Sequence, residues 1–245
     1  MRKSDDSGSF DWFLPENFRD RVSFLIPLLI TFDHLPSFND FSRWDEVAES
    51  VRVIAGLADA ANAPTEIRFL NNAEPIRIGT EEDKGDELAR VTTQLAIEPH
   101  GQTPICAQLL EVISQVKSMD SDLRKSNKVA LLVIMTDGES SDGSIIETLK
   151  ALEGFPVQVI VRISTEEKEV VDYWQNINSE LDLDIYVLEG YEWEANLVSK
   201  KNSWLTYGEP LHQIRAFGIA VPGVNSLSYR QLNKENIKGI CELLL

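Results

Sequence analysis

VALLVIMTDGES, residues 129–140, is the stretch that decides the fold. Its first seven residues are apolar without polar alternation, which is typical of a strand buried on both faces inside a parallel sheet covered by helices. The run leads to Asp137, and Gly138 then allows a sharp turn. Because open α/β sheets bind ligands at the carboxyl ends of their strands, Asp137 is a candidate binding residue.

The pattern on both sides of this stretch predicts alternating strands and helices. The expected strands cover residues 28–32, 66–70, 75–78, 129–135, 157–163 and 185–188, and the expected helices cover residues 44–58, 87–96, 103–116, 145–152 and 170–181. Right-handed crossovers between such elements predict an α/β fold with a doubly wound, mainly parallel sheet flanked by helices. We expect a polar N-terminal extension at residues 1–21, the α/β domain at residues 22–190, and a C-terminal extension at residues 191–245 that packs on it.

The C-terminal extension is rich in aromatic residues. Its pattern predicts a helix at residues 193–200, an irregular stretch at residues 204–217 and a closing helix at residues 233–243. Trp193, Trp204 and Tyr207 are expected to pack against the sheet, whereas exposed aromatic residues there would mark an interface.

Composition and charge disfavour several classes of partner. Forty Asp and Glu residues against 23 Lys and Arg give a formal net charge of −17, which repels nucleic-acid phosphate and anionic lipid. The longest apolar stretch, residues 24–32, contains Pro27 and is much shorter than the roughly 20 residues that span a bilayer.

With only Cys106 and Cys241, no disulfide framework is indicated. Residues 1–10 have no apolar signal-peptide core, so we expect a cytoplasmic protein.

Three oxygen-bearing residues are expected at the carboxyl edge of the sheet. Asp33 follows the first strand, Thr103 begins a helix before Pro104, and Asp137 follows the fourth strand. Carboxylate and hydroxyl oxygens without nearby His or Cys suit a hard cation, and Mg2+ suits them best. Taken singly, Thr103 also fits a helix N-cap with Pro104 at the first helical position, and Asp137 fits a turn residue.

Thr103 lies in GQTPI at residues 101–105, and Asp137 lies in TDGE at residues 136–139. These two motifs resemble those of the von Willebrand factor type A (VWA) family, and SRWDE at residues 42–46 and RFLN at residues 68–71 are also similar to intracellular members. In that family a metal-ion-dependent adhesion site joins such a Thr and Asp to an Asp-x-Ser-x-Ser motif after the first strand. The resemblance covers about residues 22–190. It implies a VWA-like, Rossmann-like fold, with Mg2+ held by Asp33, Ser37, Thr103 and Asp137 and an open position for an Asp or Glu of a protein partner.

The first motif departs from the family pattern. The segment DHLPS at residues 33–37 places Leu35, which cannot ligate a metal, where the family has a serine. Asp5, Ser7 and Ser9 match the pattern fully, yet residues 1–4 are too few and too polar to form a buried central strand. The alternative that residues 10–41 are an insertion that displaced the first strand stays open.

These patterns predict a binding protein and not an enzyme. The leading expectation is metal-dependent binding of a protein partner. A metal-free interaction scaffold with a degenerate site, which uses residues 193–217, is the alternative. A small-molecule enzyme on a Rossmann-like sheet is a third, for which the chain offers no Gly-x-Gly-x-x-Gly motif, no Gly-Lys-Ser/Thr loop and no nucleophile elbow.

Overall fold

The strands in the described part of the chain form one sheet. A computed structural model describes residues 27–31, 43–60, 63–70, 74–79, 86–97, 101–165, 167–216 and 223–244. Its strands are β1 (Pro27–Thr31), β2 (Thr65–Phe69), β3 (Ile76–Ile78), β4 (Ala130–Thr136), β5 (Val157–Ile163) and β6 (Asp184–Leu188). They lie in the order β3-β2-β1-β4-β5-β6, and every described pairing is parallel except that of β2 with β3. The α/β class expected from the sequence is confirmed.

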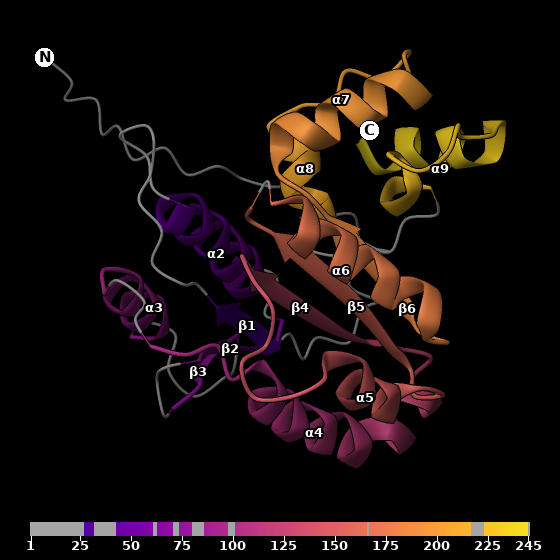
Figure 1. Ribbon diagram of the computed structural model, residues 1–245. Helices are drawn as coiled ribbons and strands as arrows, with labels where there is room; N and C mark the ends of the chain where they lie inside the picture. The colour runs from indigo at the N-terminus through magenta and orange to yellow at the C-terminus, as the bar shows by residue number, and fades with distance from the viewer. Residues whose placement is uncertain are drawn as a thin grey trace, which may run out of the picture.

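Helices cover both faces of this sheet. They are α2 (Arg43–Ala60), α3 (Glu87–Leu95), α4 (Ile105–Lys125), α5 (Ile145–Leu149), α6 (Lys168–Glu180), α7 (Tyr191–Lys201), α8 (Glu209–Ala216) and α9 (Lys234–Leu244). Figure 1 shows α2 and α3 on one side of the sheet and α4, α5 and α6 on the other.

Strand β4 is buried along its whole length because it packs against helices on both sides. Leu131, Val133 and Met135 belong to the apolar cluster of α2 and α3. Leu132 and Ile134, which alternate with them, belong to the cluster of α4, α5 and α6. This two-sided packing explains why the strand is apolar at every position instead of at every second one.

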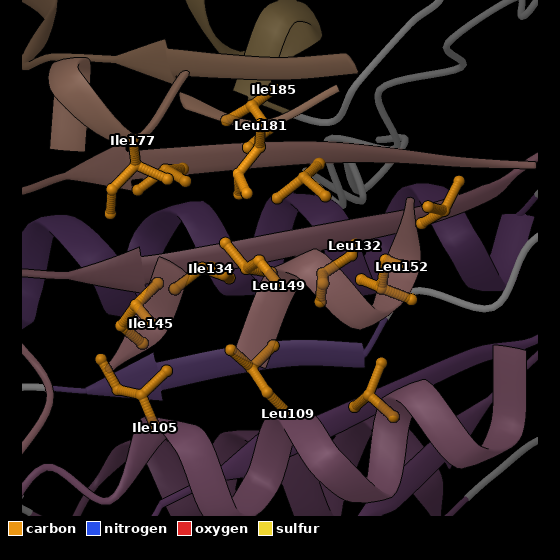
Figure 2. Close-up of a cluster of buried hydrophobic side chains, with 14 of the residues drawn as sticks. Ile105, Leu109, Leu132, Ile134, Ile145, Leu149, Leu152, Ile177, Leu181 and Ile185 are labelled. Atoms are coloured by element: carbon orange, nitrogen blue, oxygen red, sulfur yellow. The ribbon is translucent and has the colours of Figure 1, made fainter. Parts of the chain in front are cut away.

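The first residues of α4 and α5 are buried in the apolar cluster that lies between these helices, α6 and the sheet. Figure 2 shows Ile105, the first residue of α4, and Ile145, the first residue of α5, in the same cluster as Leu132 and Ile134 of β4. Full burial of one such side chain stabilises the fold by about 1.5–3 kcal/mol. The core therefore holds in place the loops that precede α4 and α5, and both loops lie at the sheet edge considered below.

The C-terminal helices have an apolar cluster of their own. Its buried members are Val198, Tyr207, Leu211, Val224, Leu227, Leu232 and Ile240. Figure 1 shows α7, α8 and α9 grouped beyond one end of the sheet. The Tyr229 hydroxyl donates a hydrogen bond to the Val187 carbonyl of β6. Arg162 of β5 donates to the Gln213 side chain of α8 at 3.3 Å, so two strands hold this part of the chain.

Two expectations for the C-terminal residues are wrong. Residues 204–217 contain the helix α8 instead of being irregular throughout, because Leu211, His212 and Arg215 are buried at helical spacing. Trp193 and Trp204 are not buried against the sheet, since 57% and 47% of their surfaces are exposed. Tyr207 is buried, but within the C-terminal cluster. None of the helices in the described ranges combines the length and apolarity needed to cross a membrane.

Candidate functional site

The carboxyl ends of the two central strands lie side by side. Thr31, the last residue of β1, is in register with Thr136, the last residue of β4. The chain therefore leaves both strands at the same edge of the sheet. Asp137 follows Thr136 directly, and Asp33 is two positions beyond Thr31 but lies outside the described residues.

The loop that carries Thr103 meets the loop that follows Asp137. The Ser141 amide donates a hydrogen bond to the Thr103 carbonyl at 2.9 Å. Thr103 and Asp137 are both buried, with 5% and 7% of their surfaces exposed. Two of the four proposed metal ligands thus lie in contacting loops at one edge, while Ser37, like Asp33, falls outside the described residues.

The turn after β4 is held from two sides. The Thr136 hydroxyl donates to the Gly138 carbonyl at 3.0 Å and accepts from the Gly138 amide at 3.2 Å, which closes a tight turn around Asp137. From α6, the Trp174 indole N–H donates to the same carbonyl at 3.1 Å. A loop with these contacts keeps Asp137 in a defined position before any ligand binds.

Asp142 caps helix α4, a role that the sequence had suggested for Thr103. The helix begins at Ile105 with Pro104 at the N-cap position, so the expectation of a Thr103 N-cap is wrong. Instead, the Asp142 carboxylate accepts hydrogen bonds from the Cys106 amide at 3.0 Å and the Ala107 amide at 2.8 Å. The cap of α4 is therefore supplied by the loop after β4 and not by the Thr103 hydroxyl.

The charge of Asp142 is stabilised where it lies. Partial burial raises the pKa of this carboxyl group, but hydrogen bonds from Ser140 and from the amides of Ala107 and Cys106 lower it more, so the pKa lies below its ordinary value. A negative charge at the start of a helix is also favoured by the helix dipole. Asp142 therefore stays ionised and joins the loop after β4 to α4.

The described residues contain only part of the predicted metal set. Among them, no group of three or more His, Cys, Asp and Glu side chains is arranged to hold a metal ion. Thr103 and Asp137 supply hydroxyl and carboxylate oxygens, which suit Mg2+. Residues 5–9 and Leu35, which bear on the choice of first motif, lie outside the described ranges, so that choice stays a prediction.

A second group of buried polar side chains lies between the sheet and the C-terminal helices, and sequence patterns did not indicate it. Its centre is the ion pair of Arg215 with Glu194 at 2.6 Å, in which each side chain is only 2% exposed. Arg215 also donates to the Tyr207 hydroxyl at 2.8 Å, and that hydroxyl lies 3.0 Å from Nδ1 of His212. Burial, together with the charges of Arg162 and Arg215, lowers the pKa of His212 to about 3, so this side chain is neutral at pH 7.

Glu189, directly after β6, is the residue of this second group that titrates near neutrality. Burial and the nearby charge of Glu194 raise its pKa from 4.5 to about 7, although a hydrogen bond from Gln175 opposes the shift and Asp172 adds to it. The rule that singles out residues at the carboxyl ends of strands applies to Glu189 as it does to Asp137. Glu189 lies outside the two VWA-like motifs and was not among the residues predicted from the sequence.

We expect the wild type to lose stability between acid and neutral pH because Glu189 releases its proton there. Glu189→Gln should abolish this pH dependence. The folded protein binds the Glu189 proton more tightly than the unfolded chain, so the favourable contribution is complete below pH 4.5 and is lost as the pH rises through about 7. Urea unfolding at several pH values should show the variant gaining on the wild type across this window. Glu192→Gln, at an exposed carboxylate on α7, is the control, and an equal gain in that variant would contradict the assignment.

No protein-family model matches this chain, and a search of curated proteins also returns no match.

Proposed function

We propose that this chain is a protein-binding domain that uses Mg2+ at the carboxyl edge of its sheet to hold a carboxylate of the partner. One observation carries the proposal: the loop that contains Thr103 is hydrogen-bonded to the loop that follows Asp137. This contact lies at the carboxyl end of β4, the strand that pairs with β1. These segments carry the two motifs that fit the VWA pattern.

The arrangement of the strands supports the finer part of this proposal, a VWA-like, doubly wound fold. The order β3-β2-β1-β4-β5-β6 puts β1 at the centre, and the chain reverses its direction of winding between β1 and β4. In open α/β sheets, ligands bind outside the carboxyl ends of the strands at such a switch point. Asp137 lies at this switch point, and Asp33 follows the neighbouring strand in sequence.

The chemistry of the donor set also fits. Asp33, Ser37, Thr103 and Asp137 are all oxygen donors, and Mg2+ binds through one or two carboxylates while it keeps several waters. Bound there, Mg2+ would supply a positive charge and an open coordination position for a partner Asp or Glu. The chain itself holds the Asp137 turn through Thr136 and Trp174, which limits the ordering that binding requires.

Mg2+ alone tests the metal site without knowledge of the partner. A ligand that binds only the folded state stabilises it by about 2.7 kcal/mol at a free concentration of about 100 times its Kd. We therefore expect MgCl2 to raise the melting temperature of the wild type, EDTA to reverse the rise, and Asp137→Ala to abolish it. A wild type that does not respond to MgCl2, or an Asp137→Ala variant that responds equally, would refute the proposal.

Asp142→Ala is the matched control for this experiment. It removes a carboxylate from the same loop, but one that caps α4, so it should lower stability by about 1 kcal/mol with or without metal and leave the response to MgCl2 intact. Asp33→Ala and Asp5→Ala then decide between the two candidate first motifs. Loss of the response in Asp5→Ala alone would transfer the site to Asp5, Ser7 and Ser9.

The second candidate function is a metal-free interaction scaffold. It is favoured by Leu35, which interrupts the first motif, and by the large aromatic surfaces that Trp204 and Tyr229 expose in the C-terminal part. Insensitivity of partner binding to EDTA would distinguish this function from the first.

A further inference from the structure

Basic residues slightly outnumber acidic residues in the C-terminal extension, six to five over residues 191–245, and they are concentrated in its middle. Residues 195–234 contain five Lys and Arg residues but a single acidic residue, Glu209, whereas the whole chain has 23 basic and 40 acidic residues. Of these five, Arg215 is buried in an ion pair, and the other four are exposed: Lys200, Lys201, Arg230 and Lys234. A locally basic surface on an acidic protein attracts negative charge over the short range that salt screening permits.

Asn202 brings the two basic segments together. Its side chain is fully buried, and its Nδ2 donates to the carbonyls of Leu227 at 2.8 Å and Arg230 at 2.9 Å. Its Oδ1 accepts from the Leu232 amide at 2.9 Å. With all three hydrogen bonds buried or partly buried, Asn202 ties the end of α7 to the segment before α9. The exposed residues that flank Asn202 and those of the segment before α9 therefore lie on neighbouring segments of the chain.

Two large aromatic side chains are exposed on the same two segments. Trp204 follows Asn202 by two positions, Tyr229 precedes Arg230, and each of the two side chains is 47% exposed. Tyr229 does not move freely, because its hydroxyl donates to the Val187 carbonyl of β6. Trp, Tyr and Arg are the residues that most often dominate the energy of protein interfaces. We call Lys200, Lys201, Trp204, Tyr229 and Arg230 the aromatic–basic surface.

We propose that the aromatic–basic surface binds an acidic segment of a partner protein, one that carries Asp or Glu beside an apolar side chain. The cations would meet the carboxylates, and Trp204 and Tyr229 would cover the apolar side chain. This inference goes beyond the metal-dependent function and deepens the second candidate, the metal-free scaffold, because the surface uses no metal and lies on different residues from the loops of Thr103 and Asp137.

The charge distribution favours an acidic protein segment over a nucleic acid. A nucleic acid carries charge along its whole length, so the part that extends past the surface would face the acidic remainder of this chain. A short peptide segment can confine its negative charge to the positions opposite Lys200, Lys201 and Arg230. The aromatic rings could stack on bases, so a single-stranded oligonucleotide must be one arm of the test.

A library of random short peptides displayed on phage tests this chemistry with the full chain and EDTA present. We expect selection on the wild type to enrich Asp and Glu together with an apolar residue. A fluorescein-labelled peptide from the enriched set should then bind, as measured by anisotropy, and bind more weakly as salt is raised. Trp204→Ala, and separately Lys200→Glu combined with Lys201→Glu, should each weaken binding by at least about tenfold.

Two controls make the outcome decisive. The first control combines Lys125→Glu with Lys150→Glu, which reverses two exposed charges near the ends of α4 and α5. Figure 1 shows these helices on the opposite side of the molecule from α7 and α9. This double variant should leave binding unchanged. Trp193→Ala removes an exposed tryptophan beside Glu192 and should also leave it unchanged. Enrichment without acidic residues, equal loss in the control variants, or tighter binding of labelled oligothymidylate would overturn the proposal. Because EDTA is present throughout, failure of the metal site cannot produce any of these results.

Discussion

Arg215→Met is expected to lower the free energy of unfolding by about 3–5 kcal/mol, because it leaves the buried Glu194 carboxylate without its cation. The two groups are 2.6 Å apart and both side chains are almost fully excluded from water. Arg215 also donates to the Tyr207 hydroxyl at 2.8 Å and to the Ser228 hydroxyl at 3.1 Å, so the substitution removes those hydrogen bonds as well. Urea unfolding of the wild type and the variant measures the effect.

The double variant separates the value of the ion pair from the penalty of breaking it. Replacing both Glu194 and Arg215 with Met leaves no buried charge, so most of the lost stability should return. Arg52→Met is the exposed control: Arg52 lies 3.5 Å from Glu49 and both side chains face solvent, so the loss should stay below about 1 kcal/mol. A loss in Arg215→Met as small as that in Arg52→Met would contradict the buried geometry.

The strands and most helices were predictable because their signal is local. The apolar runs that became β4 and β5 have the length and composition of strands covered on both faces, and the structure places them within one residue of the expected bounds. The helix α8 was missed because its buried residues include His212 and Arg215, which a hydrophobic pattern treats as polar. Their burial depends on partners elsewhere in the chain, such as Glu194, and no local pattern contains that information.

The candidate site was predictable in part for the same reason. Placing Asp137 at the end of a buried strand required only the apolar run before it and the rule for parallel sheets. The cap of α4 was assigned to Thr103 because capping residues usually stand just before the helix. The structure uses Asp142, which follows β4, and its approach to α4 depends on how the two elements pack. A contact between distant segments of the chain leaves no spacing signal in the sequence.

Trp174→Ala should destabilise the protein by about 3–5 kcal/mol, since it creates a large cavity in the cluster under α4, α5 and α6. The Trp174 side chain is fully buried, and its indole N–H is the contact through which α6 holds the Gly138 carbonyl at 3.1 Å. Trp193→Ala, at an exposed tryptophan of α7, should change stability by less than about 0.5 kcal/mol under the same conditions. Chemical denaturation of the two variants tests this difference.

Trp174→Phe distinguishes packing from the hydrogen bond. It keeps an aromatic ring in the core but removes the N–H donor and part of the ring volume, so the loss should be about 1–2 kcal/mol, because the Thr136 hydroxyl still donates to the Gly138 carbonyl. If Mg2+ binds beside Asp137, this variant should also reduce the stabilisation produced by MgCl2, since the turn is then held from one side only. A loss in Trp174→Phe equal to that in Trp174→Ala would instead make the hydrogen bond, and not the filled core, the main source of stability at this position.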